Sequence, residues 1–159
     1  MSDQFSNEER SAFLMSLNDG REGGIIYLSN GTAFIIPDRF RTNNNIDLLA
    51  VLTSKEFQDF GGTIDGVEII IHSHPDIDGD GYPGWPSHDG QMKPNDLSSA
   101  ARLEKDFFHR QISWGVFMWL PRQGNNNAGV FFYNSNYHIY QDKTYPFFGN
   151  MNFQKFWKR

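Results

Sequence analysis

Cysteine is absent from this 159-residue chain, which excludes disulfide bonds, cysteine-ligated zinc and a thiol nucleophile. The absence does not point to one redox compartment, because a chain without cysteine tolerates both. Long apolar segments are absent as well, since no run reaches the roughly 18 residues needed to span a membrane. Residues 1–10 are polar and acidic, unlike a secretory signal. We therefore expect a soluble chain, located in the cytoplasm or exported without a cleavable signal peptide.

Positive charge is also scarce. The chain has 14 Lys and Arg residues against 19 Asp and Glu residues, which gives a net charge of −5. Binding to nucleic-acid phosphates relies on grouped basic residues, and we interpret the short basic and aromatic stretch at residues 153–159 only as a docking tail. We expect no nucleic-acid partner and, without a spanning segment, no membrane partner.

The size and the apolar content of the chain predict a single domain. Hydrophobic residues make up 38% and aromatic residues 16% of the sequence, which is ample for a core in a chain of this length. We expect residues 1–159 to form one domain, with a core at about residues 20–142 and a C-terminal tail at residues 143–159.

The spacing of apolar residues predicts an α+β order of elements. Ser6-x-x-Glu9 is a capping box that begins a helix, and Asp19-Gly20 ends it. The predicted helices cover residues 7–18, the second half of 46–60, and 96–110. The predicted strands cover residues 24–28, 32–36, 67–74, 112–120, 128–133 and 137–141. The expected architecture is a mixed central β-sheet flanked by helices.

The most informative segment is VEIIIHSHP at residues 67–75. Residues i and i+2 of a strand point to the same face, so His72 and His74 face one side while Ser73 faces the other. Pro75 has no N–H for a strand ladder, so the strand ends there and leaves the two histidines at the rim of the sheet. Two histidines and a nearby carboxylate can hold zinc with one position open for water. Asp96, at the start of a predicted helix, is one carboxylate available for this purpose.

These residues resemble the JAMM (MPN-plus) metalloprotease family, and the resemblance covers about residues 20–120. That family combines a Glu near the first core strand with His-x-His-Pro and Ser-x-x-Asp, and both His and the Asp bind zinc. Its order of elements, with a cytidine-deaminase-like architecture, also matches the predicted order. The resemblance implies that His72 and His74 are zinc ligands.

The resemblance also implies a catalytic acid/base. Glu22 matches best, because the stretch from Glu22 to Tyr27 resembles the family's Glu-x-x-Gly-aliphatic pattern. Two other carboxylates compete with it. Glu56 lies on a predicted helix, and Glu68 lies four strand residues from His72, roughly 13 Å away, which is too far to act on a water at the same zinc.

The third zinc ligand is where the sequence departs from the family pattern. Pro86-Ser87-His88-Asp89 gives Ser-x-Asp rather than Ser-x-x-Asp, whereas Asp96 opens a helix as the family's ligating Asp does. We favour Asp96 over Asp89. Ser87 then corresponds to the family's Ser, which helps to position the oxyanion or the water, and its alternative interpretation is a plain turn serine.

The acidic insertion after the histidines has a separate interpretation. Asp76, Asp78, Asp80 and Gly81 have the spacing of the first half of an EF-hand loop, but Ser87 stands where that loop has Glu, and no helix precedes it. Three oxygens at alternate positions can still hold Ca²⁺, while a solvated acidic turn is the other interpretation.

The resemblance implies a zinc-dependent hydrolase acting on a peptide or isopeptide bond of a protein or peptide substrate. The small stand-alone relatives that it most resembles are bacterial JAB-type domains, some of them toxin or effector modules, for which a cognate immunity or inhibitor protein is a further expected partner. Two alternatives stay open: a catalytically silent JAMM-like binding scaffold, and a calcium-stabilised interaction module in which the histidines are incidental.

Overall fold

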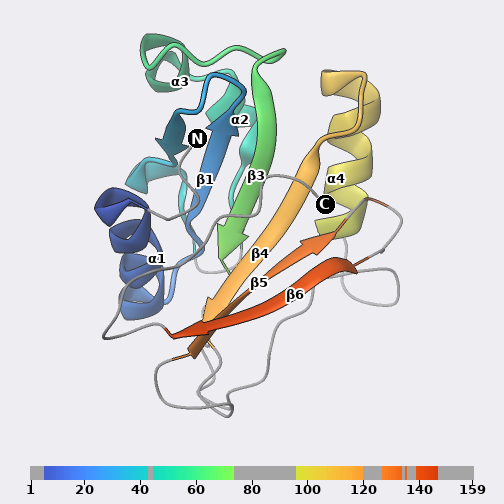
Figure 1. Cartoon of the computed structure of the whole chain (residues 1–159). Helices are drawn as coiled ribbons and strands as arrows, with labels where there is room; N and C mark the ends of the chain where they lie inside the picture. Colours follow the sequence, from blue (N-terminus) through green and yellow to red (C-terminus); the bar gives the residue numbers. More distant parts are fainter. Residues whose placement is uncertain are drawn as a thin grey trace.

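In the part of the chain that the structure describes, six strands form the central sheet. The computed structural model describes residues 6–42, 45–73, 96–119, 127–133, 135 and 139–146. The strands are β1 (Gly24–Leu28), β2 (Ala33–Ile35), β3 (Val67–Ser73), β4 (Ser113–Trp119), β5 (Asn127–Tyr133) and β6 (Ile139–Pro146), in the spatial order β2-β1-β3-β4-β5-β6. Strands β3 and β4 run parallel, and the other neighbouring pairs are antiparallel. The fold is therefore α+β with a mixed sheet flanked by helices, as expected (Figure 1).

The N-terminal part folds as its local signals predict. Ser6 caps helix α1 (Asn7–Asp19) by accepting a hydrogen bond from the Glu9 amide at 3.1 Å. Gly20 ends the helix in the left-handed conformation, with φ +68°, which is strained for residues with a Cβ atom. The hairpin of β1 and β2 follows, with Ile25 opposite Ile35.

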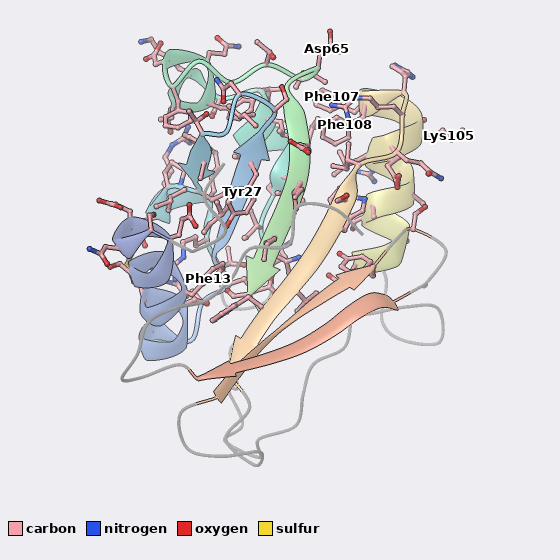
Figure 2. All side chains as sticks on the ribbon, in the orientation of Figure 1. Phe13, Tyr27, Asp65, Lys105, Phe107 and Phe108 are labelled. Carbon is pink, nitrogen blue, oxygen red and sulfur yellow. The ribbon has the colours of Figure 1, made fainter. Side chains whose placement is uncertain are left out.

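Strands β1 and β3 are covered on both faces. Every residue of β1 is buried, and in β3 only Glu68 is partly exposed. Helix α1 covers one face, where the Phe13 ring stacks on the Phe117 ring with centroids 3.9 Å apart (Figure 2). This coverage explains why the two strands read as nearly continuous apolar runs rather than as an alternating pattern.

Three further helices belong to the opposite face, and they differ in detail from the prediction. They are α2 (Leu48–Leu52), α3 (Lys55–Asp59) and α4 (Asp96–Leu103), and their apolar side chains share one core cluster with Ile26 and Ile70. Two short helices lie within residues 46–60: α2 is in the first half, where no helix was expected, and α3 is the helix expected in the second half. The second begins where the Ser54 hydroxyl accepts from the Phe57 amide at 3.2 Å.

The helix predicted over residues 96–110 changes character half-way. After Leu103 the chain continues as a π-helical segment, η2 (Glu104–Phe108), and His109 ends it with φ +53°. Figure 2 shows Phe107 and Phe108 at this end of the helix, and the Phe108 ring meets Trp114 of β4 edge-to-face. The segment therefore packs aromatic rings against the strand that follows.

The last strands extend past their predicted limits. Strand β6 runs to Pro146 rather than to residue 141, because it pairs with the whole length of β5.

A short 3-10 turn, η1 (Asp38–Phe40), follows β2 and leads to Arg41, whose side chain is buried. Among the described residues, no helix has both the length and the apolar character needed to cross a bilayer.

Candidate functional site

His72 and Asp96 meet at the C-terminal end of β3. His72 is 8% exposed and lies opposite Gly24 of β1 and Val116 of β4. Asp96 is the first residue of α4, and its Oδ1 lies 3.2 Å from Nε2 of His72. The strand and the helix thus bring together two residues that are 24 positions apart in sequence.

The charge state of His72 depends on this carboxylate. Burial alone lowers the pKa of the imidazole, but the charge and the hydrogen bond of Asp96, with a smaller effect of Glu22, raise that pKa to about 9. This pKa favours the protonated imidazole at neutral pH, so a metal ion at Nε2 would compete with that proton.

Glu22 belongs to the same electrostatic neighbourhood. It lies two residues before Gly24, which pairs with His72, and its carboxylate contributes to the raised pKa of that histidine. Its main chain is fixed, since the Glu22 amide donates to the Thr42 carbonyl at 2.7 Å. The structure thus brings Asp96 into contact with His72, and the charge of Glu22 acts on the same histidine.

Neither of the two competing carboxylates, Glu56 and Glu68, is well placed to act as the acid/base beside His72. Glu56, on α3, forms a two-contact ion pair with Arg39, at 2.6 and 3.1 Å. Figure 1 shows α3 beside the beginning of β3, whereas His72 is near the end of that strand. Glu68 is four residues before His72 on β3, as the sequence already indicated. Of the three carboxylates, Glu22 is the one whose charge is shown to act on His72.

Tyr133 is a buried residue, not identified from the sequence, whose phenol is affected by the charges of the site. It lies on β5 opposite Trp114 and is 1% exposed. Burial raises the pKa of its phenol well above the ordinary value, and the charges of Asp96, Glu22 and Glu104 raise it further. The hydroxyl therefore keeps its proton at physiological pH and stays a donor. Nothing in the local sequence indicated this role, because Tyr133 reaches the site only through the pairing of β4 and β5.

Two buried serines were also missed as site-forming residues. Ser73 was expected to face away from His72, and it does: its hydroxyl lies 2.5 Å from that of Ser16 on α1, and both residues are fully buried. Ser73 Oγ also accepts from the Gly23 amide at 2.8 Å. The residue between the two histidines therefore ties α1 to the segment that carries Glu22.

The remaining predicted site residues fall outside the described part of the chain. These are His74, Ser87, the alternative ligand Asp89, and the acidic loop residues Asp76, Asp78 and Asp80. Within the described ranges, no group of three or more His, Asp or Glu side chains is arranged to hold a metal ion. The site is accordingly characterised here by His72, Asp96 and Glu22.

The described pair fits part of a zinc site. Two donor atoms that are each about 2.0–2.1 Å from a tetrahedral zinc ion lie about 3.3 Å from one another. The distance between His72 Nε2 and Asp96 Oδ1 is 3.2 Å. An imidazole nitrogen and a carboxylate oxygen are also donors that catalytic zinc takes. His72 and Asp96 thus have the chemistry and the spacing of two ligands.

Comparison of the chain with protein-family models, with curated proteins and with solved structures gave no match.

Proposed function

We propose that this protein is a zinc-dependent hydrolase that cleaves a peptide or isopeptide bond, with a site of the JAMM type. The observation that carries the proposal is the contact of His72 with Asp96 at 3.2 Å, at the end of a buried strand whose histidine also responds to the charge of Glu22. Sequence places His74 two residues further on, where a strand would aim it to the same side as His72.

The architecture supports the same proposal. A helix, a hairpin, two short helices, a histidine-bearing strand, a further helix and three strands follow one another in the order of the family that the sequence resembles. We include in the proposal the finer fold assignment, a JAMM domain of cytidine-deaminase-like architecture. The site lies where β3 ends and α4 begins, so the chain can present it at the rim of the sheet.

The proposed mechanism assigns one task to each residue. His72, His74 and Asp96 would hold a zinc ion, which lowers the pKa of a bound water toward about 7 and polarises a carbonyl. Glu22 takes a proton from the attacking water and returns it to the leaving amine. Ser87 donates a hydrogen bond to the oxygen on which negative charge develops.

The test of this proposal is metal content. Protein purified without a histidine tag would be analysed for metals as wild type and as His74→Ala, Asp96→Ala and Asp89→Ala. We expect about one zinc per chain in the wild type and in Asp89→Ala, and loss of zinc in the other two. A wild type that takes up no zinc after reconstitution would reject the hydrolase and leave a binding scaffold. Calcium in place of zinc would direct attention to Asp76, Asp78 and Asp80.

A further inference from the structure

The segment from Arg21 to Gly23 is irregular in conformation but fixed at every main-chain position. The Arg21 carbonyl accepts from Ser16 Oγ at 2.6 Å. The Glu22 amide donates to the Thr42 carbonyl at 2.7 Å, and the Gly23 carbonyl accepts from the Ser73 amide at 2.8 Å. The segment is thus anchored to α1, to β3 and to the chain after η1.

Arg41 is the side chain that joins most of these anchors. Its side chain is 4% exposed. Nε donates to the Glu22 carbonyl at 3.1 Å, and one terminal nitrogen donates to the Arg21 carbonyl at 3.3 Å and to Asp19 at 2.9 Å. The other terminal nitrogen donates to Asp38 at 3.0 Å. Two carboxylates therefore compensate the buried charge while two main-chain carbonyls are held.

Gly23 favours this arrangement. A Cβ atom at Gly23 would lie 3.3 Å from Arg41 Nε and 3.5 Å from Ser16 Cβ. Glycine therefore leaves room for the guanidinium to approach the main chain beside Glu22. The absence of a side chain at Gly23 and the buried position of Arg41 therefore belong to the same arrangement.

We propose that Arg41 is a positioning residue that fixes the main chain of Glu22 so that its carboxylate stays beside His72. The inference rests on the proposed function, in which Glu22 is the acid/base. Arg41 does not touch the reacting atoms. It acts by donating hydrogen bonds to the carbonyls of Arg21 and Glu22. No strand or helix fixes these two carbonyls, because the segment is irregular.

Arginine suits this task better than lysine. Its planar group offers five N–H donors in fixed directions, and here it serves four acceptors at once. A lysine ammonium has three donors on a flexible stem and cannot reproduce the fork. Arg39 is a matched control two residues away, because it is 61% exposed and pairs with Glu56 on the surface.

The experiment compares Arg41→Lys with Arg39→Lys by amide hydrogen exchange and by turnover of zinc-loaded protein. For turnover, the probe is a quenched fluorescent peptide library. In Arg41→Lys we expect exchange of the Glu22 and Gly23 amides to rise at least tenfold, while the Ile70 and Ile71 amides keep their rates. We expect kcat to fall about 100-fold with KM within twofold and zinc content unchanged. Arg39→Lys should match the wild type throughout.

Several outcomes would overturn the inference. Unchanged exchange at Glu22 and Gly23 in Arg41→Lys rejects it whatever the activity. Faster exchange with normal kcat rejects the positioning role and leaves the hydrolase intact, whereas a wild type that neither binds zinc nor cleaves any peptide rejects both. If amide exchange in Arg41→Lys rose equally at Ile70 and Ile71, Arg41 would have only a general structural role. Arg41→Gln, which buries no charge, serves if the lysine variant does not fold, and fast exchange of Glu22 in the wild type itself would contradict the inference without any variant.

Discussion

At the scale of single residues, Glu22 allows the most direct separation of catalysis from metal binding. Its carboxylate lies near His72, and it is not needed as a zinc ligand in the proposed site. We predict that Glu22→Gln keeps about one zinc per chain but lowers turnover by about 10²- to 10⁴-fold, because a carboxamide cannot accept the proton from water. Parallel zinc analysis and kinetics measure this.

Glu68→Gln is the control for that prediction, since Glu68 is also a partly exposed carboxylate on the strand of His72. It should retain wild-type turnover. If Glu22→Gln turned over peptides at the wild-type rate, or if Glu68→Gln lost activity instead, the assignment of the acid/base would be wrong.

Glu104 gives a residue-scale prediction about pH. Burial raises the pKa of this carboxyl, although hydrogen bonds from Trp114, Ser135 and the main chain of Ile112 oppose the shift. The folded state therefore holds a proton at pH values where the unfolded chain has lost it, so the stability contributed by Glu104 falls as the pH rises from about 4.5 through the raised pKa.

The variant Glu104→Gln should remove this loss while keeping an acceptor for Trp114 Nε1, which lies 3.3 Å from Glu104 Oε1. We predict that urea denaturation shows the variant gaining stability relative to the wild type between pH 4 and pH 7. A gain that is the same at both pH values would contradict the prediction.

Some residues of the candidate site could be predicted from local sequence patterns, and others could not. The sequence indicated His72 through its i+2 partner and indicated Asp96 through the start of a helix, because strand and helix periodicity are local. Arg41 and Tyr133 could not be found in this way. Arg41 acts on residues about 20 positions earlier, and Tyr133 reaches the site across two strand pairings, so only the tertiary fold shows their places.

At the scale of elements, the pairing of β1 with β3 sets the position of the site. Gly24 lies opposite His72, and a Cβ atom there would come 2.8 Å from Ile36 Cδ1 and 2.9 Å from the Ile71 carbonyl. We predict that Gly24→Ala destabilises the fold by about 1–3 kcal/mol, the usual cost of overpacking, measured by urea denaturation.

Gly20→Asn is the matching control for the Gly24 prediction. No atom lies within 4 Å of a Cβ at Gly20, and asparagine adopts the left-handed conformation more readily than other residues. It should cost less than about 1 kcal/mol. Equal costs for the two substitutions would mean that close approach of β1 to β3 is not what requires Gly24.

The elements themselves show where a single sequence is informative. The limits of α1 were predictable because Ser6 and Gly20 are local start and stop signals. Helix α2 was not predicted, because the apolar spacing of residues 46–60 indicated a helix only in the second half of that range. The π-helical turn of η2 was not predictable either, since packing of Phe108 against Trp114 depends on a strand that follows later.

At the scale of the whole molecule, the two faces of the central sheet make different contacts. On one face, α1 packs against the sheet through Phe13 and through the contact between Ser16 and Ser73. On the other face, α4 brings Asp96 to His72. His72 and Ser73 are neighbours on β3. The contact of Ser73 with α1 on one face therefore limits the movement of His72 on the other face, and the contact of His72 with α4 limits the movement of Ser73. The fold class was predictable from the order of elements, whereas this coupling required the pairing of the strands.

Zinc should therefore stabilise the whole fold rather than one loop. If zinc binds only the folded state, a hundredfold excess over its dissociation constant raises the free energy of unfolding by about 2.7 kcal/mol. We predict such a rise in far-UV circular dichroism melts, its loss on chelation, and its restoration by zinc but not by calcium. Asp96→Ala should lose the response, whereas Glu22→Gln should keep it. Equal stabilisation of Asp96→Ala, or restoration by calcium alone, would contradict a zinc site at His72 and Asp96, because the binding free energy would then come from another part of the chain.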